Sequence, residues 1–78
     1  MEREGNSSYL QTAGRALSVL QLFEDKGEYS LTEISHLIHL GPTITYRLLY
    51  TLTEHCFLSQ DPVSKRYRIG DGAVMLGL

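Results

Sequence analysis

The chain has 78 residues, a formal net charge of −2 and a single cysteine. This length allows one small domain with one modest core, and a lone Cys56 excludes an internal disulfide, as is common in reducing compartments. No apolar stretch approaches the roughly 20 residues of a membrane span and no apolar signal segment follows Met1, so we expect a cytoplasmic protein without a membrane partner.

Residues 1–10 and 11–24 predict a flexible tail followed by a first helix. The tail is polar and contains glycine and serine, which disfavour order near a terminus. In the helix, apolar residues recur at helical spacing and are expected to form a core stripe: Leu10, Ala13, Leu17, Leu20 and Phe23. Thr12 is the candidate N-cap, and the helix is expected to end near Glu24.

A capping box is expected at the start of a second helix. Ser30 and Glu33 have its three-residue spacing, whereas Thr32 is the alternative cap if the helix begins later. The connection, residues 29–32, is either a loop or a very short strand. Within the helix, the apolar residues Ile34, Leu37 and Ile38 recur at helical spacing, and Leu40 follows.

A tight turn separates this helix from a third one, predicted over residues 42–55. Gly41 allows unusual backbone angles there, and Pro42 suits the first position of the new helix. One stripe of the third helix is expected to face inward: Thr45, Leu48, Leu49 and Leu52. The other face is expected to be free: Thr43, Ile44, Arg47, Tyr50, Thr51 and Glu54. This is the helix-turn-helix plan, whose second helix lies in the major groove of DNA.

A two-stranded hairpin is expected next, with an Asp-Pro turn at residues 61–62. Because an isolated hairpin is only marginally stable in water, it should pack on the helices through Leu58, Tyr67 and Ile69. The predicted fold class is therefore mainly α with a small β-hairpin. It is a winged helix-turn-helix of three helices and a two-stranded wing, formed by residues 11–70.

Residues 71–78 are apolar and predict the start of a fourth helix, with Asp71 as its candidate cap. An exposed apolar end is unusual for a soluble protein; the residues concerned are Val74, Met75, Leu76 and Leu78. This segment is therefore expected to lead as a linker into a further domain, or to pack against a second copy of the chain.

The charges are unevenly distributed. Residues 43–70 carry four bases (Arg47, Lys65, Arg66 and Arg68) and two acids (Glu54 and Asp61), whereas acids dominate the first half. A negative net charge argues weakly against nucleic acid, because a basic footprint is its usual sign. The bases nevertheless fall in the segments that a DNA-binding surface would use.

These elements and their motifs together resemble the N-terminal domain of the IclR family of bacterial transcription regulators. The resemblance is carried in one register by RALSVLQLFE, LTEIS, TYRLLYTLTEH and FLSQDPVSKRYRIG. It implies a winged helix-turn-helix that binds double-stranded operator DNA as a homodimer and acts as a repressor or an activator. It also implies a small effector molecule that binds only to a C-terminal domain absent from this chain. No cofactor is expected.

The chain departs from the family pattern in the turn. The family commonly has Leu-Pro-Lys-Ser-Thr-Val where residues 40–45 read LGPTIT, so a lysine that would contact phosphate is absent. Thr45 replaces a buried valine, and its hydroxyl is expected to bond to a carbonyl one helical turn back. Cys56 stands where the family tends to have glycine, at the end of the third helix.

The residues expected to bind DNA lie on the third helix, on the wing and at the start of the first helix: Pro42, Thr43, Ile44, Tyr46, Arg47, Lys65, Arg66, Arg68 and Arg15. Arg47 is expected to bind a phosphate or, as the alternative, a guanine edge; a salt bridge to Glu54 is the reading without DNA. Tyr46 either binds a phosphate or packs half-buried. The wing bases are backbone or minor-groove contacts, or else a solvated edge.

Other chemistries are not indicated. The histidines and Cys56 lack the paired-cysteine pattern of a metal site, and the sequence contains no glycine-rich phosphate loop, nucleophile elbow or acid/base pair, so an enzyme is not expected. The second hypothesis is a winged-helix module for protein–protein assembly without specific DNA binding, which the acidic first half and the absent lysine would favour.

Overall fold

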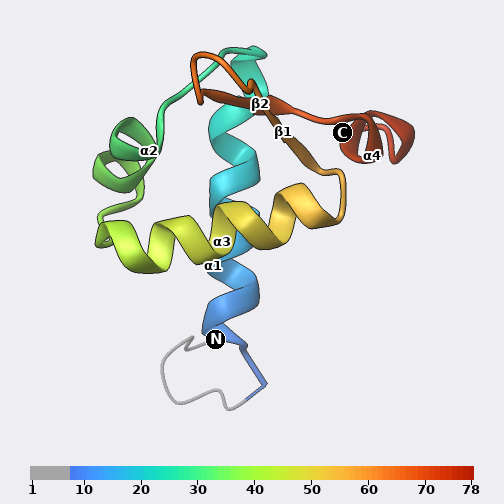
Figure 1. Ribbon diagram of the computed structural model, residues 1–78. Helices are drawn as coiled ribbons and strands as arrows, with labels where there is room; N and C mark the ends of the chain where they lie inside the picture. Colours follow the sequence, from blue (N-terminus) through green and yellow to red (C-terminus); the bar gives the residue numbers. More distant parts are fainter. Residues whose placement is uncertain (1–7) are drawn as a thin grey trace.

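In a computed structural model, which describes residues 8–78, four α-helices pack with a two-stranded antiparallel sheet that lies along one side of the molecule (Figure 1). The elements in chain order are α1 (Gln11–Gln21), the short 3-10 helix η1 (Leu22–Asp25), α2 (Leu31–Ile38), α3 (Pro42–Glu54), β1 (Leu58–Gln60), β2 (Tyr67–Ile69) and α4 (Asp71–Met75). The predicted fold class is confirmed. Residues 1–7 of the predicted tail lie outside the described residues.

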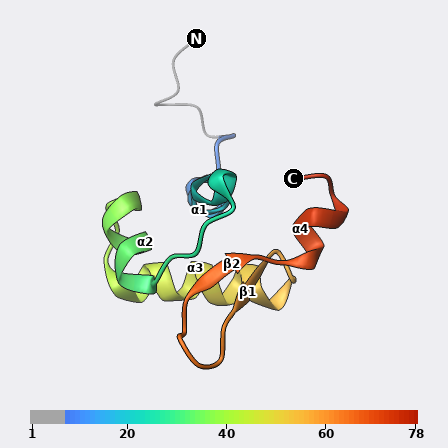
Figure 2. The same ribbon diagram turned by 90° about the horizontal axis from the view of Figure 1, so that it is seen from above.

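The helices pack around α3. In Figure 1, α1 passes behind α3 and α2 stands beside its N-terminal end, whereas the two strands and α4 lie toward the other end of the molecule. Seen from above in Figure 2, α1 is viewed nearly end-on, and the loop of the hairpin extends past α3 on the side away from α1. The hairpin and the outer face of α3 are therefore presented on the same side.

The main core cluster draws side chains from the three longer helices, η1 and both strands: Val19, Phe23, Ile34, Leu48, Leu49, Leu52, Leu58 and Tyr67. Ala73 of α4 is also fully buried. The predicted inward stripe of α3 is confirmed, since all four of its residues are buried. The hairpin also packs as predicted, because Leu58 and Tyr67 are only 2% and 3% exposed and Ile69 packs against the same cluster.

The predicted core stripe of α1 is wrong in its first half. Leu10 and Leu17 are 70% and 61% exposed, whereas Val19, which was not assigned to the stripe, is fully buried. The buried face begins later along α1, whose N-terminal turns project beyond α3 in Figure 1. Only the C-terminal half of the stripe, which includes Phe23, lies in the core.

The ends of α1 also differ from the prediction. Leu10 occupies the N-cap position and no side chain caps the helix, so Thr12 lies inside the first turn. The α-helix ends at Gln21 and the chain tightens into η1, where Phe23 leaves helical geometry. This kink places the Phe23 ring edge-on against Tyr29, with centroids 5.3 Å apart.

The predicted capping box is present at the start of α2. The Ser30 hydroxyl accepts from the Glu33 amide at 3.1 Å, and Glu33 Oε1 accepts from the Ser30 amide at 2.8 Å. The alternative cap, Thr32, therefore lies within the helix. At the other end, the left-handed residue is His39 (φ 59°) and not Gly41, whose backbone is extended. Pro42 begins α3 as predicted.

The end of α4 nearest the sheet lies close to the main chain of residues 56–58. Gly70 is the N-cap and Asp71 the first helical residue, so Asp71 is not the cap that was expected. A Cβ atom on Gly70 would lie 2.5 Å from the Cys56 carbonyl oxygen, and the Gly72 amide donates to that same oxygen at 2.7 Å. Glycine is required here because the backbones approach so closely. Among residues 8–78, none of the helices has the length and apolar character needed to cross a bilayer.

Cys56 ends α3 in a left-handed conformation, with φ 64°. The Phe57 amide donates to the Leu52 carbonyl and the Cys56 amide to the Thr53 carbonyl, both at 2.9 Å, which is the pairing of a Schellman motif.

We expect Cys56→Gly to stabilise the domain by about 0.5–1 kcal/mol, because glycine adopts this backbone without steric cost. The midpoint temperature of thermal unfolding should rise by several degrees. The matched control Cys56→Ala should give no gain; an equal gain would attribute the effect to the exposed thiol.

Thr45 is fully buried, and its hydroxyl has no hydrogen-bond partner. The expected bond to a carbonyl one turn back is therefore absent. We expect Thr45→Val to stabilise the domain by about 1–3 kcal/mol, since it keeps the shape and removes an unsatisfied buried group. Thr51→Val is the matched control in the same helix, because the Thr51 hydroxyl is exposed and donates to the Arg47 carbonyl at 2.8 Å. The measurement is urea unfolding. An equal change in the free energy of unfolding for both variants would contradict this account.

Candidate nucleic-acid interface

The outer face of α3 is the first part of the candidate interface. Its buried stripe turns the predicted free residues outward, and Pro42, Thr43, Ile44, Tyr46 and Arg47 are all exposed. Ile44 is 41% exposed, so an apolar contact surface lies among polar ones. Pro42 occupies the first helical position, where its missing amide N–H costs no hydrogen bond. The face offers a hydroxyl, a methyl-rich side chain and a guanidinium within one helical turn.

Arg15 and Arg47 lie on opposite sides of one cleft between α1 and α3. The cleft measures about 240 Å³ and is lined by Thr12, Arg15, Ile44, Arg47, Leu48 and Thr51. Among residues 8–78, neither arginine forms an ion pair, so the expected alternative of a bridge from Arg47 to Glu54 is absent. Two unpaired guanidinium groups beside one cleft form a site of positive potential suited to a phosphate.

Two tyrosines extend this face toward the sheet. The rings of Tyr46 and Tyr50 stack with centroids 6.1 Å apart, and the two residues are 51% and 54% exposed. Of the two readings of Tyr46, half-buried packing fits the stacked ring, while the exposed fraction leaves it accessible to a ligand as well. Burial raises the pKa of the neighbouring Tyr67, and the nearby Tyr46 adds to that rise.

The tip of the wing is a turn organised by Asp61. Its carboxylate accepts from the amides of Val63 and Ser64 at 3.0 and 2.6 Å. These amide donors, led by that of Ser64, lower the pKa of Asp61. Lys65 adopts a left-handed conformation, with φ 67°, and its side chain is exposed at the tip. Lys65 has no carboxylate partner among residues 8–78.

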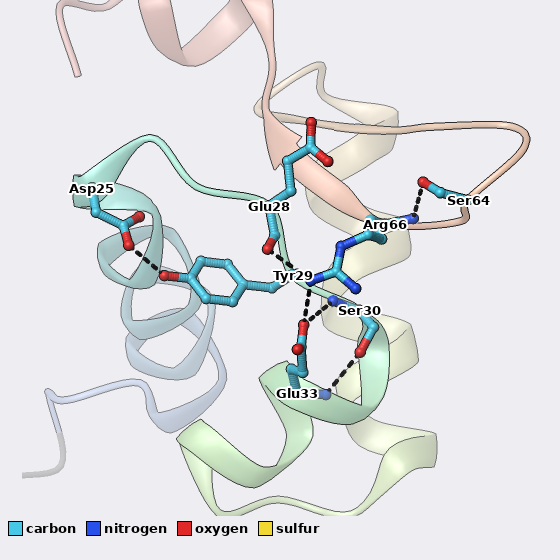
Figure 3. A network of polar contacts seen from close by, with 7 residues as sticks. All are labelled: Asp25, Glu28, Tyr29, Ser30, Glu33, Ser64 and Arg66. Carbon is cyan, nitrogen blue, oxygen red and sulfur yellow. Dashed lines mark hydrogen bonds and ion pairs between the residues drawn. The ribbon is translucent and has the colours of Figure 1, made fainter.

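The two wing arginines differ from Lys65, because both face carboxylates. Arg66 Nη2 donates to Glu33 Oε1 at 2.8 Å and to the Glu28 carbonyl at 3.1 Å, and Arg68 lies 3.8 Å from the Glu28 carboxylate. Figure 3 shows the Arg66 side chain reaching from the wing to the start of α2. The prediction assigned Arg66, with the other wing bases, to DNA contacts or a solvated edge, whereas Arg66 is directed at the capping box.

The connection before α2 attaches the wing to the helices. The main chains of Tyr29 and Tyr67 exchange two hydrogen bonds, of 3.0 and 2.8 Å, as an isolated antiparallel bridge. The very short strand offered as one alternative for residues 29–32 is thus a single bridging residue. The Tyr29 hydroxyl donates to Asp25 at 2.6 Å, and this bond lowers the pKa of Asp25 and raises that of Tyr29. Sequence reasoning missed these contacts, since nothing in the spacing of residues 25–29 signals a partner in the wing.

The arrangement of α2, α3 and the wing agrees with the comparisons to known proteins. The sequence model of the IclR helix-turn-helix domain matches residues 12–62, which is more than half of the chain. The chain belongs to the IclR family. The resemblance predicted from the motifs is thereby confirmed. IclR proteins are bacterial DNA-binding transcription regulators and not enzymes.

Individual relatives agree. The chain is 37% identical over 62 residues to the HTH-type transcriptional regulator XynR of Escherichia coli K12, covering 78% of this chain and 25% of that protein. Among solved structures, an IclR family regulator from Brucella abortus superposes with a TM-score of 0.85 at 29% identity, over 92% of this chain and 28% of the other. A regulator from Alicyclobacillus acidocaldarius gives a TM-score of 0.82 at 32% identity, over 88% and 28%.

The match to these IclR relatives covers only the winged domain. The chain spans 25% to 28% of the length of the relatives compared above. Within residues 8–78, no three or more histidine, cysteine or acidic side chains gather as a metal site would require. The exposed surfaces of α3 and of the wing are therefore the candidate site that this domain contributes.

Proposed function

We propose that this IclR domain binds operator DNA sequence-specifically as a homodimer, with α3 in the major groove and the wing against the flanking backbone. The observation that carries the proposal is the common orientation of two surfaces, the outer face of α3 and the loop of the hairpin (Figure 2). That loop carries the exposed Lys65. In helix-turn-helix proteins the second helix of the motif reads base edges while neighbouring elements bind phosphates. Such a role would place the protein in the bacterial cytoplasm.

The contacts divide by chemistry. Thr43 can donate to a base edge or a phosphate, and Ile44 suits the methyl group of thymine. Arg15 and Arg47, across their common cleft, are suited to one phosphate, as is Lys65 at the wing tip. Arg68 adds a further backbone contact, because its long, exposed pairing with Glu28 is weak. Pro42 and Tyr46 complete the surface as packing neighbours of the groove.

We expect Lys65→Gln to weaken binding to all duplexes alike and to lower the salt slope of log affinity by roughly 0.9 per protomer. The ligand would be a duplex selected by the wild-type protein from a random pool, measured by fluorescence anisotropy from low to moderate salt. Saturable, salt-sensitive binding that survives excess random competitor DNA supports the proposal. Absence of binding even at low salt would favour the protein–protein assembly module instead.

Arg47→Lys separates the two roles left open for Arg47. A lysine keeps the charge but cannot form the paired bonds that arginine makes to guanine. If Arg47 binds a phosphate, as we expect, Arg47→Lys should keep the salt slope and retain affinity within a few-fold, while Arg47→Ala weakens binding and lowers the slope by roughly 0.9 per protomer. A loss of discrimination at one base pair, worth about 1–3 kcal/mol, would assign Arg47 to a base instead.

The dimer would form through the apolar side of α1 and α4. A cleft of about 390 Å³ lies there, and its lining includes Leu17, Leu20, Phe23, Ile69 and Leu78. Around it, Val74, Met75 and Leu76 are 58%, 87% and 64% exposed. Contiguous apolar surface of this kind is unusual on a monomer, and a second copy would bring two recognition helices to successive turns of DNA. Any small effector would act through a domain outside these 78 residues.

Leu17→Asp tests this dimer. A carboxylate in the apolar interface would be desolvated without a partner, so self-association should fall at least tenfold in sedimentation equilibrium. Leu37→Asp is the matched control, because Leu37 is also a half-exposed helical leucine (51%) but lies on α2, outside the cleft. If both variants self-associate equally well and their circular dichroism is unchanged, the dimer interface lies elsewhere.

A further inference from the structure

We propose that Arg66 is a positioning residue: its guanidinium holds the wing against the start of α2 and does not bind DNA. The proposal rests on the proposed DNA binding and refines it, because it removes one base from the set that touches phosphate. Lys65, its neighbour in sequence, would then be the wing's own contact. The two adjacent bases of the wing would have opposite tasks.

The guanidinium of Arg66 is already engaged on the protein. The same nitrogen donates to Glu33 Oε1 at 2.8 Å and to the Glu28 carbonyl at 3.1 Å, while the Arg66 amide donates to the Ser64 hydroxyl at 3.2 Å. Figure 3 shows these bonds linking the wing loop, the connection before α2 and the first turn of α2. Arg66 thereby joins the wing to Glu33 and Glu28, which lie 33 and 38 residues before it in the sequence.

The partner carboxylate is also held in place by the helix cap. Glu33 Oε1 also accepts from the Ser30 amide at 2.8 Å, as half of the capping box. This bond from Ser30 is the largest cause of the lowered pKa of Glu33, and Arg66 lowers it further. An exposed ion pair usually contributes little, since two long side chains must be ordered. Here one of them is ordered by the helix cap, and the pair belongs to a network.

Arg66 is poorly placed to bind a phosphate. The Glu33 carboxylate lies 2.8 Å from its nitrogen, so a phosphate arriving there would have to displace Glu33 or stand beside a like charge. Lys65 has no such neighbour, because among residues 8–78 the carboxylates paired with wing bases face Arg66 and Arg68. The negative charge near the wing thus selects between adjacent bases.

The wing needs this anchor. Its strands have three residues each, and a hairpin of that size is marginal on its own. Buried Leu58 and Tyr67 fix its base, but the loop beyond Gln60 extends past α3 (Figure 2). Arg66 attaches the loop where it returns, one residue from Lys65. Loss of the anchor would leave the tip lysine free to move away from the backbone it contacts.

The test measures binding to a duplex selected by the wild-type protein. Three variants, Glu33→Gln, Arg66→Gln and the double variant that combines them, are each compared with Lys65→Gln. Glutamine at position 33 still serves in a capping box, so the start of α2 is kept and only the charge is lost. Because the loosened wing loses its lysine contact, we expect both single variants to weaken binding about three- to tenfold and to lower the salt slope together, by no more than Lys65→Gln does; the double variant should be no weaker than either. Lys65→Gln should lower the slope by roughly 0.9 per protomer.

Whether Glu33→Gln weakens or tightens DNA binding distinguishes a positioning role of Arg66 from direct contact with DNA. If Arg66 bound DNA, Glu33→Gln would remove the competing carboxylate and tighten binding, and only Arg66→Gln of the two variants would lower the salt slope; either result overturns the proposal. Hydroxyl-radical footprints supply the second readout. With the anchor lost, protection at the wing's position should fade while protection around α3 persists, whereas uniform loss of both would mean a merely structural role and reject positioning. Failure of the wild-type protein to bind would instead refute the DNA-binding function itself.

Discussion

The burial of one stripe of α3 controls the rest of the structure. Thr45 and Leu49 have no exposed surface, and Leu48 and Leu52 are nearly covered, so the helix cannot rotate about its axis without exposing the centre of the core. This constraint directs Thr43, Ile44 and Arg47 outward together. It holds so firmly that the Thr45 hydroxyl is buried without a partner, a cost that the surrounding packing must exceed.

The wing depends on a second constraint, which is polar. Its base is fixed by apolar side chains, but its register against the helices comes from the bridge between Tyr29 and Tyr67 and from the Arg66–Glu33 pair. The capping box therefore has two functions: it begins α2, and it orients the carboxylate that receives the wing. A helix terminus and a hairpin 33 residues away are coupled through one oxygen atom.

The electrostatic character of the interface follows from this coupling. By count, residues 43–70 carry twice as many bases as acids, which suggests a wing rich in free positive charge. In the fold, Glu28 and Glu33 from the acidic half approach Arg68 and Arg66. Among residues 8–78, the unpaired bases of the candidate interface are then Arg15, Arg47 and Lys65, contributed by α1, α3 and the wing. The potential is thus less basic than the count implies and more sharply localised.

The sequence by itself determined the helix-turn-helix, the capping box, the inward stripe of α3, the hairpin and the family, because each depends on spacing within about a dozen residues or on a continuous motif. Only the tertiary structure decided that Leu10 and Leu17 face outward, that His39 and not Gly41 adopts the left-handed turn, and that Arg66 is paired. Periodicity predicts which residues of a helix share a face, but not how far a neighbouring helix extends to cover it. Likewise, charge along the chain cannot reveal which acid a distant base will meet once the chain has folded.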